Sequence, residues 1–322
     1  MTRSLRTLAV LAAVAALALP ALAADDALNL VPANAVTVGM VKLADMRTSP
    51  LSSMLFEHTD KMSSDGEAEK FLLDAGLSPT KDVDVLVVAT SPRTALGSEA
   101  DVLVIAEGRF QPARLTNAIV SRGAIKKGAY LLLPEEKGDQ GAVAFVSPSL
   151  AIAGNERAVI AALEARANGG TGFRSRGNLG LDLARIDNKA TAWALVDVTR
   201  AARLAKGGTI HTGKGQSGDA LQVAIKSLST VAVWATDTGD TLELGAIGLS
   251  SDTETLELLE DTVRGALSAL RLAVKDKAPE MVSTLRRFDV SRKSDSILVE
   301  GSIPAATLRE LMAKKTAAAG SK

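Results

Sequence analysis

The residues best placed to do chemistry form the stretch "GTIHTGKG", from Gly208 to Gly215. It has the spacing of a phosphate-binding loop, in which four residues separate a glycine from a Gly-Lys pair. Such a loop needs Ser or Thr after the lysine to hold magnesium, and Gly215 stands there instead. A buried strand must also precede the loop, whereas Ala201 to Lys206 reads as the start of a helix. We therefore interpret the stretch as a glycine-rich surface loop.

Two histidines, His58 and His211, are the next candidates for catalysis or metal binding. A zinc site needs several converging ligands, and the chain has neither an HxxxH nor an HExxH spacing. There is no G-x-S-x-G nucleophile elbow. The chain contains no cysteine, which excludes thiol catalysis, disulfides and thiolate metal sites. The sequence predicts no catalytic, cofactor-binding or metal-binding residue and implies no cofactor.

Carboxylates gather in three places along the chain. These are Asp25-Asp26, Asp82 with Asp84, and the group Glu254, Glu257, Glu260 and Asp261. None has the alternating oxygen ligands, central glycine and closing glutamate of a calcium loop. We interpret them as solvated helix faces and strand edges. A pair of carboxylates for glycoside hydrolysis stays an open alternative, because such pairs meet only in the folded chain.

The two tryptophans, Trp193 and Trp234, both lie in apolar segments that read as strands. Packing in the core is the default for such residues, and lining a pocket is the alternative. Aromatic residues make up only 3% of the chain, so stacking platforms for bases or sugars are few. Basic and acidic residues balance at 37 each, and the basic ones are scattered. Nucleic-acid binding, which needs a concentrated basic face, is therefore not expected.

The first residues have the layout of a secretory signal peptide. Arg3 and Arg6 precede an apolar run, Leu8 to Leu19, and Pro20 ends it. Small residues follow, which predicts cleavage after Ala23 and an exported protein, periplasmic or extracellular. The alternative is an uncleaved N-terminal anchor, but the apolar run is short for a membrane span. No membrane span is expected after signal cleavage.

The rest of the chain alternates strands and helices. Two apolar segments, one on each side of the turn Asp237 to Asp240, predict a hairpin. Strands are expected at Val36–Leu43, Asp84–Thr90, Asp101–Gly108, Tyr130–Leu133, Ala142–Val146, Leu150–Ala153, Thr191–Val198, Val231–Thr236, Leu242–Leu249, Phe288–Ser291 and Ser296–Ile303. Helices are expected from Pro50 to His58, at Asp65–Ala75, Pro112–Gly123 and Asn155–Ala167, from Thr199, after a capping box at Ser251 and Glu254, and at Pro304–Met312.

This order of elements repeats. Ala35 to Arg47 aligns without gaps on Ala190 to Ala202, strand on strand and helix start on helix start. "VLVVATS", from Val85, aligns on "VAVWATD", from Val231. We expect a signal peptide at 1–23, a first α+β unit at 24–170 and a second at 171–322. Each unit is expected to be a mainly antiparallel sheet with helices packed on one face.

Three stretches carry a resemblance: "LVPANAVTVGMVKLADMRTSPL", "FLLDAGLSPTKDVDVLVVA" and "DTLELGAIGLSSDTETLELL". They resemble a loose group of secreted bacterial proteins of unknown function. Those proteins open with a signal peptide or lipobox and a "lP-x-x-a" turn, and a "G-[LI]-x-P-x-x-D" turn leads into a later strand. The resemblance implies tandem α+β units and an exported location, and it carries no catalytic residues.

The favoured hypothesis is an exported, non-catalytic binding or structural protein of the periplasm or cell surface. Its partner would be an unidentified envelope protein or a small ligand. Two alternatives stay open: a periplasmic hydrolase that uses carboxylates, and a carrier whose apolar ligand is enclosed between the sheet and the long helix after Ser251.

Overall fold

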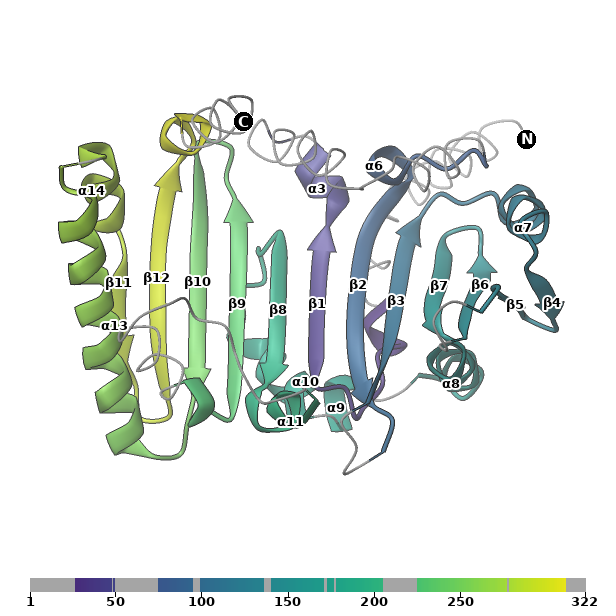
Figure 1. The fold of residues 1–322 in the computed structure, drawn as a ribbon, viewed down its shortest axis with the longest axis horizontal. Coiled ribbons are helices and arrows are strands. Elements are labelled where there is room, and N and C mark those ends of the chain that lie inside the picture. The colour runs from purple at the N-terminus through teal and green to yellow at the C-terminus, as the bar shows by residue number, and fades with distance from the viewer. Residues whose placement is uncertain are drawn as a thin grey trace, which may run out of the picture.

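The strands of this protein form one twelve-stranded sheet in which every neighbouring pair runs antiparallel (Figure 1). The computed structural model describes residues 27–47, 49, 75–94, 99–135, 140–170, 173–176, 178–204, 225–276 and 278–310. The fold is α+β with a large antiparallel sheet, as the sequence predicts. The expected units do not form separate sheets, because the described strands of both belong to this one sheet.

The elements have the following bounds. The strands are β1 (Thr37–Lys42), β2 (Val83–Pro92), β3 (Ala100–Gly108), β4 (Ile125–Lys127), β5 (Tyr130–Leu132), β6 (Gly141–Ser147), β7 (Leu150–Asn155), β8 (Ala192–Asp197), β9 (Thr230–Asp237), β10 (Thr241–Leu249), β11 (Asp289–Arg292) and β12 (Ser296–Pro304). The helices are α3 (Leu43–Arg47), α6 (Pro79–Asp82), α7 (Pro112–Val120), α8 (Glu156–Ala167), α9 (Phe173–Arg176), α10 (Asn178–Asp182), the 3-10 turn η1 (Leu183–Arg185), α11 (Val198–Leu204), α13 (Thr253–Val274) and α14 (Pro279–Leu285). Residues 305–310 are also helical.

The first strands of the two halves of the chain meet in the middle of the sheet. The order is β11-β12-β10-β9-β8-β1-β2-β3-β7-β6-β5-β4. β1 pairs with β8, with Val38 opposite Leu195 and Met40 opposite Trp193. Strands from the first half of the sequence extend to one side of this pair and strands from the second half to the other.

Local sequence explains the hairpins that build the sheet. β2 and β3, which cover the predicted strands Asp84–Thr90 and Asp101–Gly108, are rich in valine and other β-formers and pair over most of their length. The predicted hairpin of β9 and β10 is also confirmed. In its turn, Gly239 adopts a φ of 86°, which favours glycine. The Oδ1 atom of Asp237 accepts a 2.8 Å hydrogen bond from the Gly239 N–H and so fixes the turn.

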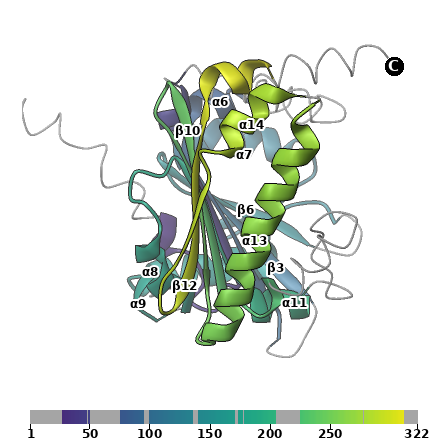
Figure 2. The same cartoon turned by 90° about the vertical axis from the view of Figure 1, so that its left-hand side faces the viewer.

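Helices cover both faces of the sheet, so the prediction that they pack on one face is wrong (Figure 2). Ile152 of β7 packs with Val159 of α8, whereas the next residue back, Ala151, belongs to the cluster around Leu115 of α7. Neighbouring residues in a strand point to opposite faces, so α7 and α8 lie on opposite sides. The run "VLVIA" in β3 is apolar on both faces: Leu103 and Ile105 are fully buried on one, whereas Val102 on the other is 39% exposed.

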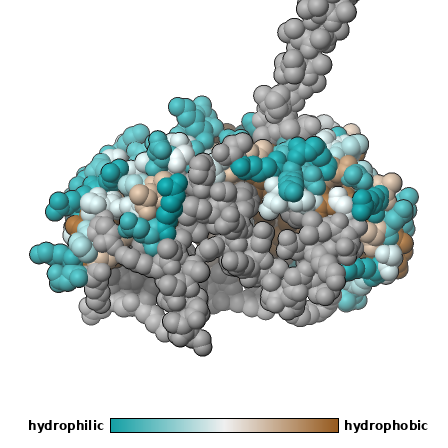
Figure 3. Space-filling view, turned by 90° about the horizontal axis from the view of Figure 1, so that it is seen from above, coloured by the Kyte–Doolittle hydropathy of each residue, from teal (hydrophilic) through white to brown (hydrophobic). Residues whose placement is uncertain are grey.

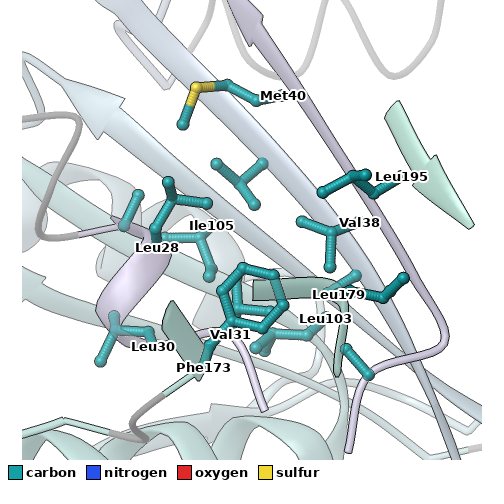
Figure 4. Packing of buried hydrophobic residues seen from close by; sticks show 14 of the residues in the cluster. Leu28, Leu30, Val31, Val38, Met40, Leu103, Ile105, Phe173, Leu179 and Leu195 are labelled. Atoms are coloured by element: carbon teal, nitrogen blue, oxygen red, sulfur yellow. The ribbon is translucent and has the colours of Figure 1, made fainter. Parts of the chain in front are cut away.

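The largest core cluster includes buried residues from both halves of the chain. It unites Val38 and Ile105 of the first half with Leu195 of the second. Figure 4 shows the ring of Phe173 among Val31, Leu103 and Leu179. The two expected units therefore share a core, and the cover of this face comes from α8, α9, α10 and the segment just before β1.

The long helix α13 covers the other face at one end of the sheet. Its N-cap is Asp252, whose side chain accepts a hydrogen bond from the Glu254 N–H. The sequence prediction placed the cap one residue earlier, at Ser251. Leu256 and Leu259 then pack in a cluster that includes Ile297 of β12. The apolar stripe of the helix therefore contacts the sheet, as expected for an amphipathic helix.

Two further results bear on the sequence predictions. The predicted helices from Pro50 to His58 and at Asp65–Ala75 lie outside the described residues, except for Ala75.

β4 was not expected, and it places Lys126 and Lys127 on the edge of the sheet, where lysines oppose pairing with other chains. None of the described helices is both long and apolar enough to cross a bilayer.

Candidate functional site

Most candidates for catalysis lie outside the described residues. These are the stretch Gly208 to Gly215, both histidines and Asp25-Asp26. Within the described ranges, no group of three or more Asp, Glu, His or Cys residues is placed to hold a metal ion.

Asp82, Asp84 and Glu260, three of the other carboxylates singled out in the sequence, have structural partners. Asp84 pairs with Arg47 at 2.6 Å, and the Oδ2 atom of Asp82 accepts a hydrogen bond from the Ser78 N–H at 2.7 Å. On α13, Glu260 pairs with Arg264 at 2.9 Å and with Arg292 of β11 at 3.0 Å. These contacts fasten helices and loops to the sheet.

A second polar cluster joins β4 and β5 to the start of α8. The Tyr130 hydroxyl donates a 2.7 Å hydrogen bond to Glu156, and the Lys127 ammonium lies 3.2 Å from the same oxygen. The hydrogen bond from Tyr130, followed by that from Lys127, lowers the pKa of Glu156. Hydrogen bonding to Glu156 raises the pKa of both Tyr130 and Lys127. Lys127 is exposed, whereas Tyr130 and Glu156 are partly buried, and we interpret the cluster as a clamp between strand and helix.

The two tryptophans form the feature that the sequence analysis left open. Trp193 and Trp234 are direct partners in the β8–β9 register, so both lie on the face that carries the large core. Trp193 is 9% exposed, and Trp234 is partly buried. A β-carbon at Gly245 would lie 2.1 Å from Cε2 of Trp234. The indole ring therefore lies over this glycine of β10, and the absence of a side chain there makes room for it.

A pocket of about 400 Å³ opens beside Trp193, and we refer to it as the Trp193 pocket. Apolar side chains from the sheet and its cover line it, among them Leu28, Met40 and Trp193. Three charged residues, Lys42, Arg174 and Asp187, also line it.

A second pocket of about 390 Å³ opens beside Trp234, and we refer to it as the Trp234 pocket. Trp234, Ile247 and Leu298 contribute its apolar lining. Four charged residues, Arg185, Asp187, Lys293 and Glu300, also line it. Both pockets lie in the size range of small-molecule sites, which spans roughly 300–1,000 Å³.

One short segment separates the two pockets. Ala184, Ile186 and Asp187 line both of them. The Ile186 N–H donates to the Leu183 carbonyl at 3.2 Å, and Asp187 Oδ1 accepts from the Lys189 N–H at 2.9 Å. This turn brings the segment across the tryptophan pair, with Ile186 buried against the core.

The electrostatics of the two pockets differ. Arg185 pairs with Asp295 at 2.6 Å, and this hydrogen bond lowers the pKa of the Asp295 carboxyl and raises that of Arg185. The Lys42 ammonium instead donates to the backbone carbonyl of Asn188 at 3.4 Å. Among the described residues it has no ion-pair partner.

The described residues thus form two hollows on either side of one short segment. The Trp193 pocket is mainly apolar with a few charged groups, as is typical of small-molecule sites, whereas the Trp234 pocket is lined by apolar and charged side chains in similar number. Sequence reasoning identified both tryptophans and left pocket lining as the alternative. It missed the segment 184–187, which carries no motif. The signal that could have found the site is the placement of both tryptophans in apolar strands, with Gly245 in the strand that follows.

Comparison with known proteins gives the chain no family. No family model matches it, and no curated protein matches it significantly. Among solved structures it is similar to crystal form III of TP0453, with 12% identity over 89% of this chain and 97% of that one, and a TM-score of 0.47. It is also similar to crystal form I, with 10% identity over the same shares and a TM-score of 0.45.

Proposed function

We propose that this chain is an exported, non-catalytic binding protein whose ligand lies in the Trp193 and Trp234 pockets. The observation that carries the proposal is the cross-strand tryptophan pair with a pocket beside each ring. Aromatic rings offer a large, rigid apolar area, and the charged groups nearby can fix orientation. The ion pairs of Asp84 and Glu260 support a non-catalytic role, since both serve the fold.

The experiment uses the two indole N–H groups as reporters, because the chain has only two tryptophans. The protein is purified gently from its own cell envelope and examined by native mass spectrometry for a bound small molecule. The released compound is then titrated into stripped, 15N-labelled protein. We expect the indole resonances to move. If no compound is retained and envelope small-molecule extracts move neither resonance, the proposal fails.

Two variants provide the matched test. Ala184→Phe places a ring in the wall shared by both pockets and should abolish the response. Leu272→Phe makes a similar addition on α13, where the side chain is 73% exposed, and should leave the response intact. Equal responses in the two variants would place the ligand elsewhere.

Export and the two-unit organisation belong to the same proposal. The N-terminal sequence layout supports secretion, and we expect the protein from the envelope fraction to begin at Ala24 by N-terminal sequencing. A start at Met1 would contradict cleavage. The central pairing of β1 with β8, followed outward by β2 and β3 on one side and β9 and β10 on the other, supports two related units.

A second candidate, a carrier of an apolar ligand, is favoured by the opposite face of the sheet. Val88, Val102 and Val233 point to the face that carries α7 and α13, and they are 39%, 39% and 45% exposed. Seen from above (Figure 3), the described surface is mainly hydrophilic, with hydrophobic patches at its left and right ends. If the protein is such a carrier, Val233→Ser should weaken binding of an alkane or lipid probe and leave the response of the indole resonances to the pocket ligand unchanged.

A further inference from the structure

We propose that the Trp193 pocket binds a molecule with an apolar body and one anionic group, which Lys42 and Arg174 hold. This inference rests on the proposed binding function and specifies the ligand class at one of its two pockets. Three features of the pocket support it. These are the apolar floor, Lys42 at the end of β1, and the hydrogen bond that Asp187 already accepts within its own turn.

The floor of the pocket fits an apolar body. Leu28, Met40 and Trp193 are all buried members of the main core, and each reaches the pocket. Met40 and Trp193 are direct partners in the β1–β8 register, so they stand side by side on the sheet. The part of these side chains that the pocket leaves exposed is apolar, and covering it with an apolar ligand is favourable in proportion to the area covered.

The lysine places a positive charge next to this floor. Side chains alternate along a strand, and Lys42 follows Met40 by two residues, so both lie on the same face of the sheet. Its stem can lie along apolar surface while the ammonium stays at the opening. Among the described residues, that ammonium donates a hydrogen bond to the Asn188 carbonyl at 3.4 Å and forms no ion pair. A ligand anion would give it a charge-assisted hydrogen bond.

The remaining charges favour an anion over a cation. Arg174 adds a second positive side chain, and Asp187 is the one carboxylate in the lining. Asp187 already accepts a hydrogen bond from the Lys189 N–H in its own turn. The Trp234 pocket provides the contrast. Its lining has two positive side chains, Arg185 and Lys293, and two negative ones, Asp187 and Glu300, and Arg185 is paired with Asp295.

The test compares probes that differ in one group. Naphthalene-2-carboxylate and decanoate are titrated into 15N-labelled protein beside the neutral 2-naphthalenemethanol, and the two indole resonances are followed. Trp193→Phe assigns the signals. We expect both acids to move the Trp193 resonance first and naphthalene-2-carboxylate to bind more tightly than the alcohol. The relative affinities of the two acids show whether the body is a flat ring or an alkyl chain.

Charge-removing variants complete the design. Lys42→Gln and Arg174→Gln should each weaken acid binding by roughly tenfold, as expected for loss of a hydrogen bond to a charged group, and leave alcohol binding unchanged. Lys275→Gln, at the exposed end of α13, is the matched control and should change neither.

The outcomes separate this inference from the proposed function. If the alcohol binds as tightly as naphthalene-2-carboxylate, or if Lys42→Gln and Arg174→Gln leave acid affinity unchanged, the anionic group is refuted while binding in the pocket stands. If none of the three probes moves the Trp193 resonance, the inference is also refuted. The proposed function is then decided by the envelope-derived compound alone.

Discussion

Replacing Gly245 with alanine adds only one methyl group, but it should disturb the Trp234 pocket strongly. The new β-carbon would lie 2.1 Å from Cε2, 2.2 Å from Cζ2 and 2.5 Å from Nε1 of Trp234. Carbon atoms in contact normally lie about 3.5–4.0 Å apart, so the ring must move by roughly 1 Å or more. Overpacking of this kind costs about 1–3 kcal/mol, and alanine recovers about 0.5–1 kcal/mol over glycine in a strand. We expect a net loss of about 1–2 kcal/mol in the free energy of unfolding.

Urea unfolding measures this loss, and the Trp234 indole resonance reports the movement of the ring. Gly265→Ala is the control, because a β-carbon there meets nothing within 4 Å. In an exposed helix that change should stabilise the protein by about 0.5–1 kcal/mol. In a Trp234→Leu background, Gly245→Ala should cost much less, because the ring is gone. An equal cost in that background, or an unmoved indole resonance in Gly245→Ala, would refute the reasoning.

Two further predictions concern the core and the long helix. Ile105→Ala removes a fully buried side chain and should lower the free energy of unfolding by about 2–5 kcal/mol, whereas Ile125→Ala, at a side chain 64% exposed, should change it by less than about 0.5 kcal/mol. Equal losses in urea unfolding would show that burial does not set the cost. Asp252→Ala removes the cap of α13 and should lower the urea midpoint. The hydrogen bond from Thr255 lowers the pKa of Asp252, so its contribution is full above its ordinary value of 3.8 and fades as the pH falls through the lower folded value. A difference between wild type and variant that grows on acidification would contradict this assignment.

Local pattern predicted the elements well and their surroundings poorly. The hairpin of β9 and β10 followed from an apolar run on each side of a turn with Gly239. The cap of α13 was missed by one residue, because Ser251 and Asp252 are both good caps and only the backbone path chooses between them. The cover of both faces was missed because apolar runs like that of β3 were assigned to one buried face.

The candidate site could be predicted only as two residues. Trp193 and Trp234 stand out by type, but their pairing depends on the register of β8 against β9. The two strands are separated by α11 and the residues after it, so no tight turn fixes that register in the sequence. The wall at 184–187 could not be foreseen, since its position comes from tertiary packing of Ile186 into the core.

The central pairing of β1 with β8 has a consequence for how the chain folds. Gly39 and Ala194 meet as neighbours although they lie in opposite halves of the sequence. Such a contact closes a very long loop, which slows folding. During synthesis β1 is made well before β8, and until β8 arrives the hairpin of β2 and β3 leaves one edge of β1 unpaired. That unpaired edge carries "TVGMV", an apolar strand of the kind that pairs with other chains, so it favours aggregation of nascent chains until β8 is made.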